Sequence, residues 1–593
     1  MSIVPRGMSI TEAYRSYRSG NLLVNRKYQR KLVWTVEEKS RLIGSILKGY
    51  PIPLILLAER PKIHGSGKYE VIDGIQRLNA ICSFIENSFS FEEKYFDVKE
   101  FSFAKQLADH SSFETVNDNN NLLSPRECSN ILDYQLAVTI YTAMEEEDIT
   151  EVFGRINSNG KHLSNQEKRQ AGITTAFAEV VRTIAMKLRG DDSQKILNLY
   201  EMPEISIDSR PSYQGYGIKA EDTLWCKQGI LTISKLRDSE DEDMIADIAA
   251  SILLSEPLAR SRENLDNLYD RESRYFETIE NSLALYTAEK LQDNIIKNFS
   301  IIRETIESYS SETKCLLNIV NPGSNNPIPQ AFYTIFMAFF DLTINQELLP
   351  SDTTSIIKSL MNLQRNLNLS KRYATTRDRK TNIDSTKGRI RDYFVKPDRS
   401  TLGHGVELTV ELENSIRRSY IETTKYECKQ GLLDLSENRK LNKDLLQRLI
   451  DTICGIANLG SDSEGYIFIG VADKESDVNR IENLDNIKAI ELNRRYIVGI
   501  DREARIFNQS LEDYVKVLTN AVLNSELTEP LKTQVLANFD IVLYKKQYSV
   551  VRITVPRQNE VSFVGNRAFI RKGSSTIEVQ GKELLAISKN FNK

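Results

Sequence analysis

The sequence predicts a multidomain chain in which α/β and α+β domains lie on either side of a helical middle. Three observations support this fold class. A chain of 593 residues is too long for one hydrophobic core, since a domain holds about 150 residues as a soft prior. Strand-like apolar runs occur within residues 1–100 and again after residue 400, whereas the spacing in between is mostly helical. The expected domains are 1–130, a helical domain 131–395, a linker 396–404, and 405–593.

The first hundred residues are predicted to form mixed α/β structure. Thr35, with Glu38 three positions on, matches a capping box that starts a helix. The runs LILLAE and KYEVID then have the pattern of strands separated by a turn-rich segment. Later strands are predicted at 465–473, 540–546, 548–556 and 567–573.

The composition argues against several classes of function. A net charge of −4 does not suit a protein that coats nucleic acid by charge alone. The six cysteines include no C-x-x-C pair and the four histidines are scattered, so zinc and HNH-type sites are not expected. The longest apolar run, residues 331–340, is about half the ~20 residues of a membrane span. We expect a buried helix there, reduced thiols, a cytoplasmic location and no membrane partner.

The stretch YEVIDGIQRLNAI (69–81) runs from a predicted strand through Asp73 and Gly74 into a helix that opens at Gln76 and Arg77. The first-turn N–H groups of a helix lack intrahelical partners and the helix dipole is positive there, so this position suits an anion. Gly74 allows close backbone approach, and Arg77 offers two donors to phosphate oxygens. Asp73 is placed to hold a metal or orient a water. The alternative, that Asp-Gly simply makes a good turn, stays open for this stretch alone.

Two further motifs, YQRKLVW (28–34) and VFGRINSNGKHLSNQEKRQAG (152–172), stand upstream and downstream of DGIQR. In this order the three motifs resemble the N-terminal domain of GmrSD-type modification-dependent restriction enzymes, over roughly residues 10–175. The resemblance implies a ParB/sulfiredoxin-like core with a helical extension, and binding and hydrolysis of a nucleoside triphosphate (NTP). Ile75 departs from the family, which commonly has a second glutamine there. The residues carried over to nucleotide binding are Tyr28, Gln29, Arg30, Asp73, Gly74, Gln76, Arg77, Arg155, Asn157 and Gly160.

A second candidate site lies in YIETTKYECKQG (420–431), where acidic residues and a lysine stand beside apolar sequence. If KYECKQ is a strand, Glu427 and Lys429 share one face, because side chains alternate with period two. Glu422 precedes this strand, and Asp473 ends the predicted strand GYIFIGVAD. Three carboxylates and a lysine are the parts of a phosphodiesterase that uses Mg²⁺ or Mn²⁺. The alternative is an exposed glutamate pair with Lys429 as a surface ion-pair partner.

This stretch, together with TICGIANLGSDSEGYIFIGVADKE (452–475) and RAFIRKGSST (567–576), looks like the AlbA-type domain of the Schlafen family over about residues 405–590. The resemblance implies a ribonuclease whose metal-binding catalytic acids follow E-x4-E-x-K and a later G-V-x-D. These acids fall on Glu422, Glu427 and Asp473, and Lys429 matches the lysine. The segment NLGSDSEGY departs from the family, which usually has a short N-T-x-G-G.

Two basic segments are candidate contacts for nucleic acid. Arg571 and Lys572 open a segment suited to phosphates, and an ordinary strand end with a turn explains them equally well. Residues 365–396 hold ten Lys or Arg against three Asp, a stripe that suits a phosphate backbone. A solvated helix face balanced by acidic neighbours is the simpler explanation. The candidate contacts in this stripe are Lys371, Arg372, Arg377 and Arg379.

Taken with the two resemblances, these patterns predict an anti-phage defence or restriction-type protein. An NTP-responsive sensor would control a metal-dependent endonuclease, with RNA (tRNA for example) as the favoured substrate and DNA next. The expected cofactors are Mg²⁺ or Mn²⁺, with an NTP as substrate or effector. Nucleic acid is the expected partner, and homo-oligomerisation is left open. Two alternatives remain: a non-catalytic nucleic-acid-binding regulator, and an NTPase whose last domain mediates oligomerisation.

Overall fold

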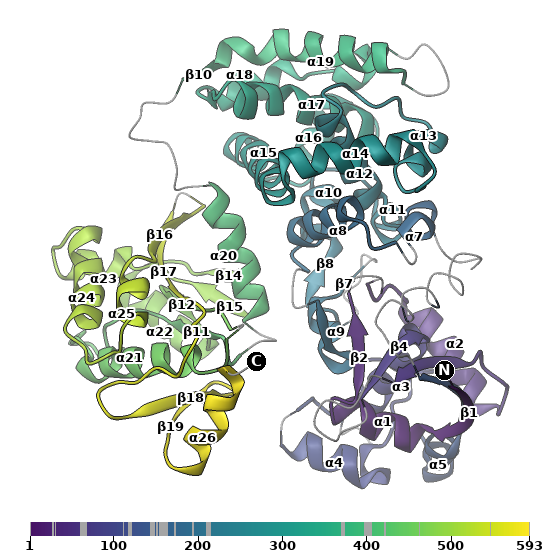
Figure 1. Cartoon of the computed structure of the whole chain (residues 1–593), viewed down its shortest axis with the longest axis vertical. Helices are drawn as coiled ribbons and strands as arrows, with labels where there is room; N and C mark the ends of the chain where they lie inside the picture. Colours follow the sequence, from purple (N-terminus) through teal and green to yellow (C-terminus); the bar gives the residue numbers. More distant parts are fainter. Residues whose placement is uncertain are drawn as a thin grey trace. The chain divides into compact units, whose positions relative to one another are not determined.

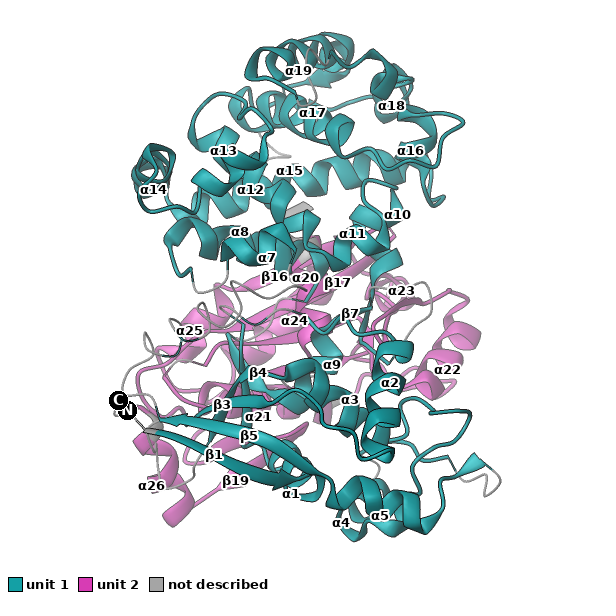
Figure 2. Cartoon of the chain, turned by 90° about the vertical axis from the view of Figure 1, so that its right-hand side faces the viewer, with its two compact units in different colours: residues 1–400 teal, residues 401–593 magenta. Residues whose placement is uncertain are grey.

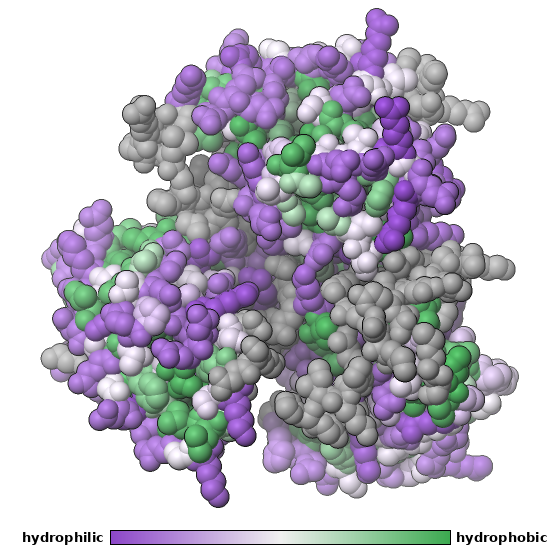
Figure 3. Space-filling model, in the orientation of Figure 1, coloured by the Kyte–Doolittle hydropathy of each residue, from purple (hydrophilic) through white to green (hydrophobic). Residues whose placement is uncertain are grey.

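A computed structural model of the chain describes residues 2–26, 29, 31–59, 68–110, 112–116, 121–142, 149, 152, 164–170, 173–191, 195–208, 215–368, 374–396, 406–419, 423–461, 463–545 and 547–591. The chain divides into two compact units, residues 1–400 and 401–593, which Figure 2 colours separately. Figure 1 labels the helices and strands of both units. In the space-filling view of Figure 3, hydrophilic residues cover much of the visible face, in keeping with apolar residues packed inward.

The first unit contains a mixed six-stranded sheet in the order β1-β5-β3-β4-β2-β6. β3 runs parallel to β5 and β2 runs parallel to β4, whereas the other neighbours are antiparallel. The strands predicted from LILLAE and KYEVID are confirmed as β3 and β4. The sheet consists of β1 (Ser2–Ser9), β2 (Leu22–Asn25), β3 (Ile55–Glu59), β4 (Tyr69–Asp73), β5 (Gln135–Thr142) and β6 (Ile196–Asn198).

Helices accompany this sheet, and α2 begins as the sequence predicts. Thr35 Oγ1 accepts a hydrogen bond from the Glu38 N–H at 3.2 Å, and Glu38 Oε2 accepts one from the Thr35 N–H at 2.8 Å. The two reciprocal bonds satisfy donors that have no intrahelical acceptor. The helices of this region are α1 (Ile10–Arg18), α2 (Val36–Leu47), α3 (Ile75–Ile85), α4 (Ser102–Asp109) and α5 (Pro125–Asp133).

The sheet extends past residue 130, into the segment that the sequence assigned to the helical domain. β5 lies between β1 and β3, and β6 pairs with β2. Leu136, Val138 and Ile140 are buried while Gln135, Ala137 and Thr139 are more exposed, which is the pattern of a half-buried strand. Two strands of this sheet therefore lie within residues 131–395, and α7 (Asn165–Gln170) and α8 (Ala176–Arg189) come between them in sequence.

The rest of the first unit is mostly helical, and the helix predicted at 331–340 is confirmed as a buried one. Its aromatic side chains pack with Trp225 and Phe299 in the core of this region. No helix among the described residues is long and apolar enough to cross a membrane. The helices are α7 (Asn165–Gln170), α8 (Ala176–Arg189), α9 (Met202–Ile205), α10 (Leu224–Lys227), α11 (Ile233–Arg237), α12 (Glu240–Leu253), α13 (Arg262–Asn267), α14 (Arg274–Tyr286), α15 (Ala288–Tyr309), α16 (Cys315–Val320), α17 (Pro329–Phe340), α18 (Thr353–Ser359) and α19 (Thr376–Ile390). Short strand pairs join β7 (Ile207–Asp208) to β8 (Ile218–Lys219) and β9 (Leu349–Pro350) to β10 (Phe394–Val395).

The second unit is built on a four-stranded sheet in the order β11-β12-β17-β16. One core packs Leu412 and Ile416 against one face of the sheet, and another packs Ile453 against the other face. This sheet consists of β11 (Tyr426–Lys429), β12 (Gly465–Ile469), β16 (Phe539–Tyr544) and β17 (Tyr548–Val555). Smaller sheets are formed by β13 (Val471–Ala472), β14 (Ile490–Leu492) and β15 (Arg495–Ile497), and by the hairpin of β18 (Ala568–Lys572) and β19 (Ser575–Val579). The helices are α20 (Val406–Arg418), α21 (Lys443–Ala457), α22 (Glu475–Asp485), α23 (Asp501–Ile506), α24 (Leu511–Leu523), α25 (Leu531–Leu536) and α26 (Lys582–Ser588).

The strand predicted over 465–473 is divided in two at Gly470. This glycine has φ +103°, a left-handed conformation that residues with a Cβ rarely adopt. The turn lets β12 pair with β11 and β17 while β13 pairs with β15. The predicted fold class of α/β and α+β domains with a helical middle is confirmed.

Candidate functional site

The strand β11 carries two of the four predicted catalytic residues. β11 is at one end of the sheet order, and its neighbour β12 runs parallel to it. Tyr426 and Cys428 are buried in the core that includes α20 residues. Glu427 and Lys429 share the opposite face, as predicted from the period-two spacing.

Glu427 is held between two cations. Arg571 Nη2 lies 2.8 Å from Glu427 Oε2, and Lys429 Nζ contacts Glu427 Oε1. The Glu427 side chain is 14% exposed, so its charge is only partly solvated and depends on these partners. Lys429, with 34% of its side chain exposed, is the more accessible of the two cations.

Arg571 reaches Glu427 from the hairpin strand β18, and its side chain is only 2% exposed. The guanidinium also donates to the carbonyls of Thr423 at 3.2 Å and Tyr426 at 3.1 Å, and to Thr576 Oγ1 at 3.2 Å. The structure contradicts the prediction that Arg571 contacts a phosphate, because this guanidinium is buried against the start of β11.

The neighbouring Lys572 differs, because its side chain is 56% exposed. It forms a pair with Glu583 in which Nζ and Oε1 are 3.4 Å apart. An exposed pair of this kind adds little stability and leaves the lysine open to an anion.

Asp473 directly follows β13, with 46% of its side chain exposed. Its cationic neighbour is Arg495 on β15, whose Nη1 lies 3.6 Å from Asp473 Oδ2. Burial raises the pKa of the Cys428 thiol to about 11; Arg495 opposes this shift, whereas Glu427 and Asp473 add to it. The charges of Glu427 and Asp473 therefore both raise the pKa of the Cys428 thiol. Arg495 was not anticipated, since nothing in its local sequence marks it.

The third predicted acid, Glu422, lies outside the described residues. Among the residues that the structure does describe, no group of three His, Cys, Asp or Glu side chains could hold a metal ion. The carboxylates of Glu427 and Asp473, which the structure does describe, are the type of ligand that Mg²⁺ and Mn²⁺ prefer. Lys429 would have to leave Glu427 Oε1 to make room for such an ion.

In the first unit, DGIQR forms the predicted strand-to-helix turn. β4 ends at Asp73, and Gly74 precedes α3 with φ 103° and no side-chain cap. Arg77 Nη2 lies 2.7 Å from Asp73 Oδ2 and donates to the Leu54 carbonyl at 3.0 Å. Asp73 keeps 40% of its side chain exposed, so the pair lies at the surface of this turn.

The two motif glutamines tie the upstream segment to this turn. Gln76 Oε1 accepts from the N–H groups of Val33 at 3.1 Å and Trp34 at 3.2 Å, and its Nε2 donates to the Lys31 carbonyl at 3.0 Å. Gln29 Nε2 donates to two carbonyls of β4, those of Val71 at 2.6 Å and Ile72 at 2.9 Å.

Both glutamines are buried, so these amides organise the backbone around the turn. The structure thereby brings the first two motifs together. Five other residues assigned to nucleotide binding lie outside the described part of the chain: Tyr28, Arg30, Arg155, Asn157 and Gly160.

Only some of the basic residues within 365–396 are exposed at the surface. Arg377 is exposed at the start of α19, whereas Arg379 is buried and forms two 2.7 Å contacts with the Asp247 carboxylate. Burial works to raise the pKa of Asp247, but Arg379 and Arg260 outweigh it and the pKa is lowered. The prediction of a nucleic-acid contact at Arg379 is wrong, because its donors are used inside the fold. Lys371 and Arg372 lie outside the described residues.

Comparison with models of protein families gives two matches. Residues 10–174 match the GmrSD restriction endonuclease N-terminal domain, and residues 422–580 match the Schlafen AlbA_2 domain. The fusion inferred from the motifs is confirmed, and DGIQR and the strand with Glu427 each fall within one of the matched ranges. No curated protein matches the chain.

Proposed function

We propose that the chain is a restriction-type, anti-phage defence protein in which an NTP-responsive N-terminal domain controls a metal-dependent endonuclease in residues 401–593. The observation that carries the proposal is the half-buried carboxylate of Glu427 on the edge strand β11, paired with Lys429 of the same strand and Arg571 of β18. An acid beside two cations suits a site where a divalent ion and a phosphate meet. The matches to a restriction endonuclease domain and a Schlafen domain support nuclease chemistry.

In this site, Glu422, Glu427 and Asp473 would hold Mg²⁺ or Mn²⁺ through hard oxygen donors. Such an ion, when bound, activates water and stabilises the oxygen that leaves the phosphodiester. Lys429 has more room to move than Arg571, since their side chains are 34% and 2% exposed. Lys429 therefore turns from Glu427 toward a phosphate oxygen as the substrate binds, while Arg571 keeps Glu427 Oε2 fixed.

The proposed substrate is RNA, with tRNA as the first to test and DNA next, because the Schlafen match covers the strand with Glu427. The NTP would bind at the turn formed by Asp73, Gly74 and Arg77. Its phosphates would meet the first-turn N–H groups of α3, and Arg77 would exchange Asp73 for a phosphate oxygen.

The test incubates the purified chain with labelled tRNA, single-stranded DNA and duplex DNA, each with and without NTP and Mn²⁺. We expect cleavage of tRNA that requires Mn²⁺, responds to NTP and is lost in Glu427→Gln and Asp473→Asn. Glu583→Gln is the matched control, because Glu583 is an exposed acid paired with Lys572. Cleavage that survives both site substitutions would overturn the proposal.

Both carboxylate oxygens of Glu427 are already paired with cations. This favours a second candidate function, that of a regulator that binds nucleic acid without cutting it. In this case Glu427 is a structural acid that ties β18 to β11. Binding without metal, with the nucleic acid left intact, would support the regulator. Activity that depends on Asp73 and not on Glu427 would instead favour an NTPase with a C-terminal oligomerisation domain.

A further inference from the structure

The chain leaves the sheet directly after Lys429, and the backbone there is held by buried side chains. Leu432 and Leu433 are 1% and 2% exposed, so their N–H groups need protein partners. Both N–H groups donate to the Glu503 carboxylate: Leu432 to Oε2 at 2.6 Å and Leu433 to the same oxygen at 3.2 Å. The carbonyl of Gln430 accepts from Arg502 Nη2 at 2.6 Å.

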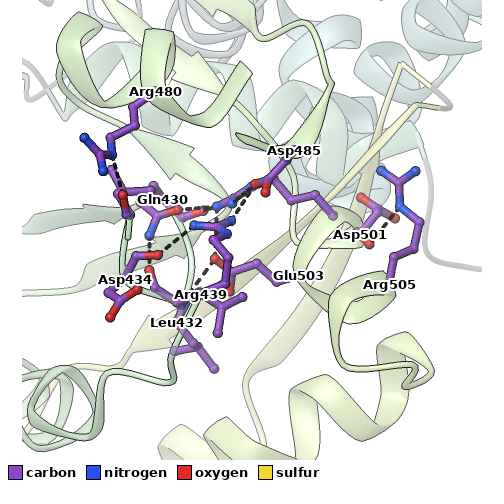
Figure 4. Close-up of polar contacts among 12 residues, drawn as sticks. Gln430, Leu432, Asp434, Arg439, Arg480, Asp485, Asp501, Glu503 and Arg505 are labelled. Atoms are coloured by element: carbon purple, nitrogen blue, oxygen red, sulfur yellow. Dashed lines mark hydrogen bonds and ion pairs between the residues drawn. The ribbon is translucent and has the colours of Figure 1, made fainter. Parts of the chain in front are cut away.

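Arg502 and Glu503 are adjacent on α23 and have almost no exposed side-chain surface. Arg502 Nη1 lies 2.6 Å from Asp485 Oδ2. The same oxygen lies 2.5 Å from Arg439 Nη2, and Figure 4 shows Arg439 beside Asp485. The Tyr514 hydroxyl donates to Glu503 Oε2 at 2.7 Å. Two arginines balance two acids, so the network is neutral and each charge has a partner, which buried charges require.

Gly431 shows how close this contact is. A Cβ atom at Gly431 would lie 2.0 Å from Glu503 Oε1 and 2.3 Å from its Cδ, so a side chain there would push the carboxylate away. The glycine two residues after Lys429 is therefore needed for the carboxylate to reach the Leu432 N–H.

The strand β11 is thus fixed at both ends by side chains from elsewhere. Arg571 binds carbonyls at its start, and the Arg502–Glu503 pair binds the backbone just past its end. β11 is an edge strand whose neighbour in the sheet order is β12, so backbone hydrogen bonds to β12 hold it along one side. The two attachments add to those hydrogen bonds.

We propose that Glu503, supported by Arg502, is a positioning residue that sets the placement of Glu427 and Lys429 through the backbone of Gln430–Leu433. This inference rests on the proposed nuclease function. Glu503 touches neither Glu427 nor Lys429 in the contacts described above, so it acts on turnover through the strand and not on the substrate. A reacting group displaced by about 1 Å loses up to about 10²-fold in rate.

The test compares Glu503→Gln and Gly431→Ala with the control Asp501→Asn. Glutamine replaces one acceptor oxygen by an NH₂ donor that faces N–H and O–H donors. It also leaves Arg439 and Arg502 to share the single negative charge of Asp485. Asp501 is on the same helix and also accepts backbone and hydroxyl bonds, from Ser549 N at 2.6 Å and Ser549 Oγ at 2.8 Å. Those bonds hold β17 and not β11, so Asp501→Asn loosens a different strand and leaves the hydrogen bonds of Glu503 in place.

The measurements are kcat and KM on tRNA, Mn²⁺ affinity by calorimetry, and a thermal melt of each full-length variant. We expect Glu503→Gln and Gly431→Ala to lower kcat by about tenfold or more, with KM within about twofold, at a temperature where each is fully folded. We also expect both to weaken Mn²⁺ binding. Asp501→Asn should keep the wild-type kcat even where its melting temperature falls.

A folded Glu503→Gln or Gly431→Ala variant with the wild-type kcat overturns the inference. If Glu503→Gln does not fold, Gly431→Ala decides, because it disturbs the same contact while keeping the carboxylate. If the wild-type chain cleaves no substrate, the nuclease proposal fails by itself. The positioning role is then judged by Mn²⁺ affinity, and unchanged affinity in both variants rejects it.

Discussion

Arg571 and Glu427 form an ion pair of 2.8 Å between Nη2 and Oε2, with the arginine side chain almost completely buried. The same guanidinium binds the carbonyls of Thr423 and Tyr426. This one side chain therefore anchors the β18–β19 hairpin to the strand that carries the candidate acid.

Replacing Arg571 by methionine should destabilise the second unit strongly. The change leaves Glu427 with Lys429 as its cationic partner and removes donors from two backbone carbonyls. Breaking such a pair costs about 3 kcal/mol in the free energy of unfolding. Urea unfolding of the full chain measures the loss, and the double variant Arg571→Met/Glu427→Met should recover part of it. Lys572→Met, at the exposed neighbouring pair, should change stability by less than about 1 kcal/mol; equal losses in the two single variants would contradict the assigned role.

Replacing Lys429 by methionine should separate metal binding from cleavage. Lys429 competes with a cation for Glu427 Oε1. A partly exposed pair contributes about 0.2–1 kcal/mol, so its removal should tighten Mn²⁺ binding by about 1.4- to 5-fold. Cleavage should nevertheless fall, because no ammonium remains to meet the phosphate. Calorimetry with Mn²⁺ and a tRNA cleavage assay measure the two effects; weaker Mn²⁺ binding would show that Lys429 supports the ion rather than competes with it.

Local spacing was enough to predict where Glu427 and Lys429 lie, since the alternation of side chains along a strand depends only on the strand itself. It could not identify Arg571 as their partner, because the meeting of β18 with β11 is a tertiary event between distant segments. The division at Gly470 was likewise missed, since an apolar run does not reveal which sheet each half joins.

The glutamine motifs show a second limit. Gln29 and Gln76 were assigned to a nucleotide because they recur in a family pattern, whereas their amides bind the backbone of Lys31–Trp34 and β4. A motif marks a residue as needed without telling whether it contacts a ligand or the chain. The contrast between Arg377 and Arg379 has the same origin, because two positions along one helix face different environments.

Gln76→Met should therefore destabilise the first unit. The substitution keeps the volume of the side chain but leaves three backbone groups around Val33 without their partners. Each unsatisfied buried group costs about 1–3 kcal/mol. A thermal melt of the full chain should show a lower melting temperature for the first unit, and Gln106→Met, at an exposed position of α4, is the control. An unchanged melt together with lost NTP binding would instead favour a direct ligand contact.

Arg377→Ala should affect nucleic-acid binding, whereas Arg379→Met should affect the stability of the fold. Arg377 is exposed, so its loss should weaken nucleic-acid binding and reduce the salt dependence by about one counterion, with little change in stability. Arg379 is bound to Asp247, so its loss leaves this buried carboxylate with Arg260 as its remaining cationic partner and should lower the melting temperature. Filter binding over a salt series and thermal melts distinguish the two. A folded Arg379→Met variant whose nucleic-acid binding depends less on salt than that of the wild type would show that Arg379 contacts the nucleic acid.

Lys39 in α2 should make the stability of the first unit depend on pH. Its side chain is buried beneath Tyr216, with Nζ 4.9 Å from the ring centroid, and burial lowers the pKa of Lys39 to about 8 despite the nearby Asp208. Between pH 8 and the ordinary pKa of lysine near 10.5, the unfolded chain binds more protons at this site than the folded chain, so stability rises with pH.

Lys39→Met removes this contribution. The variant should be more stable than the wild type at pH 7, by on the order of 2 kcal/mol once the lost cation–π contact is counted. The difference should shrink as the pH rises from 8 to 10.5, because the wild-type lysine is then neutral when folded. Urea unfolding at pH 7, 8.5 and 10 measures it. Lys48→Met, at the exposed end of the same helix, is the control; a constant difference between the Lys39 variant and the wild type across this range would show that Lys39 stays charged inside the fold.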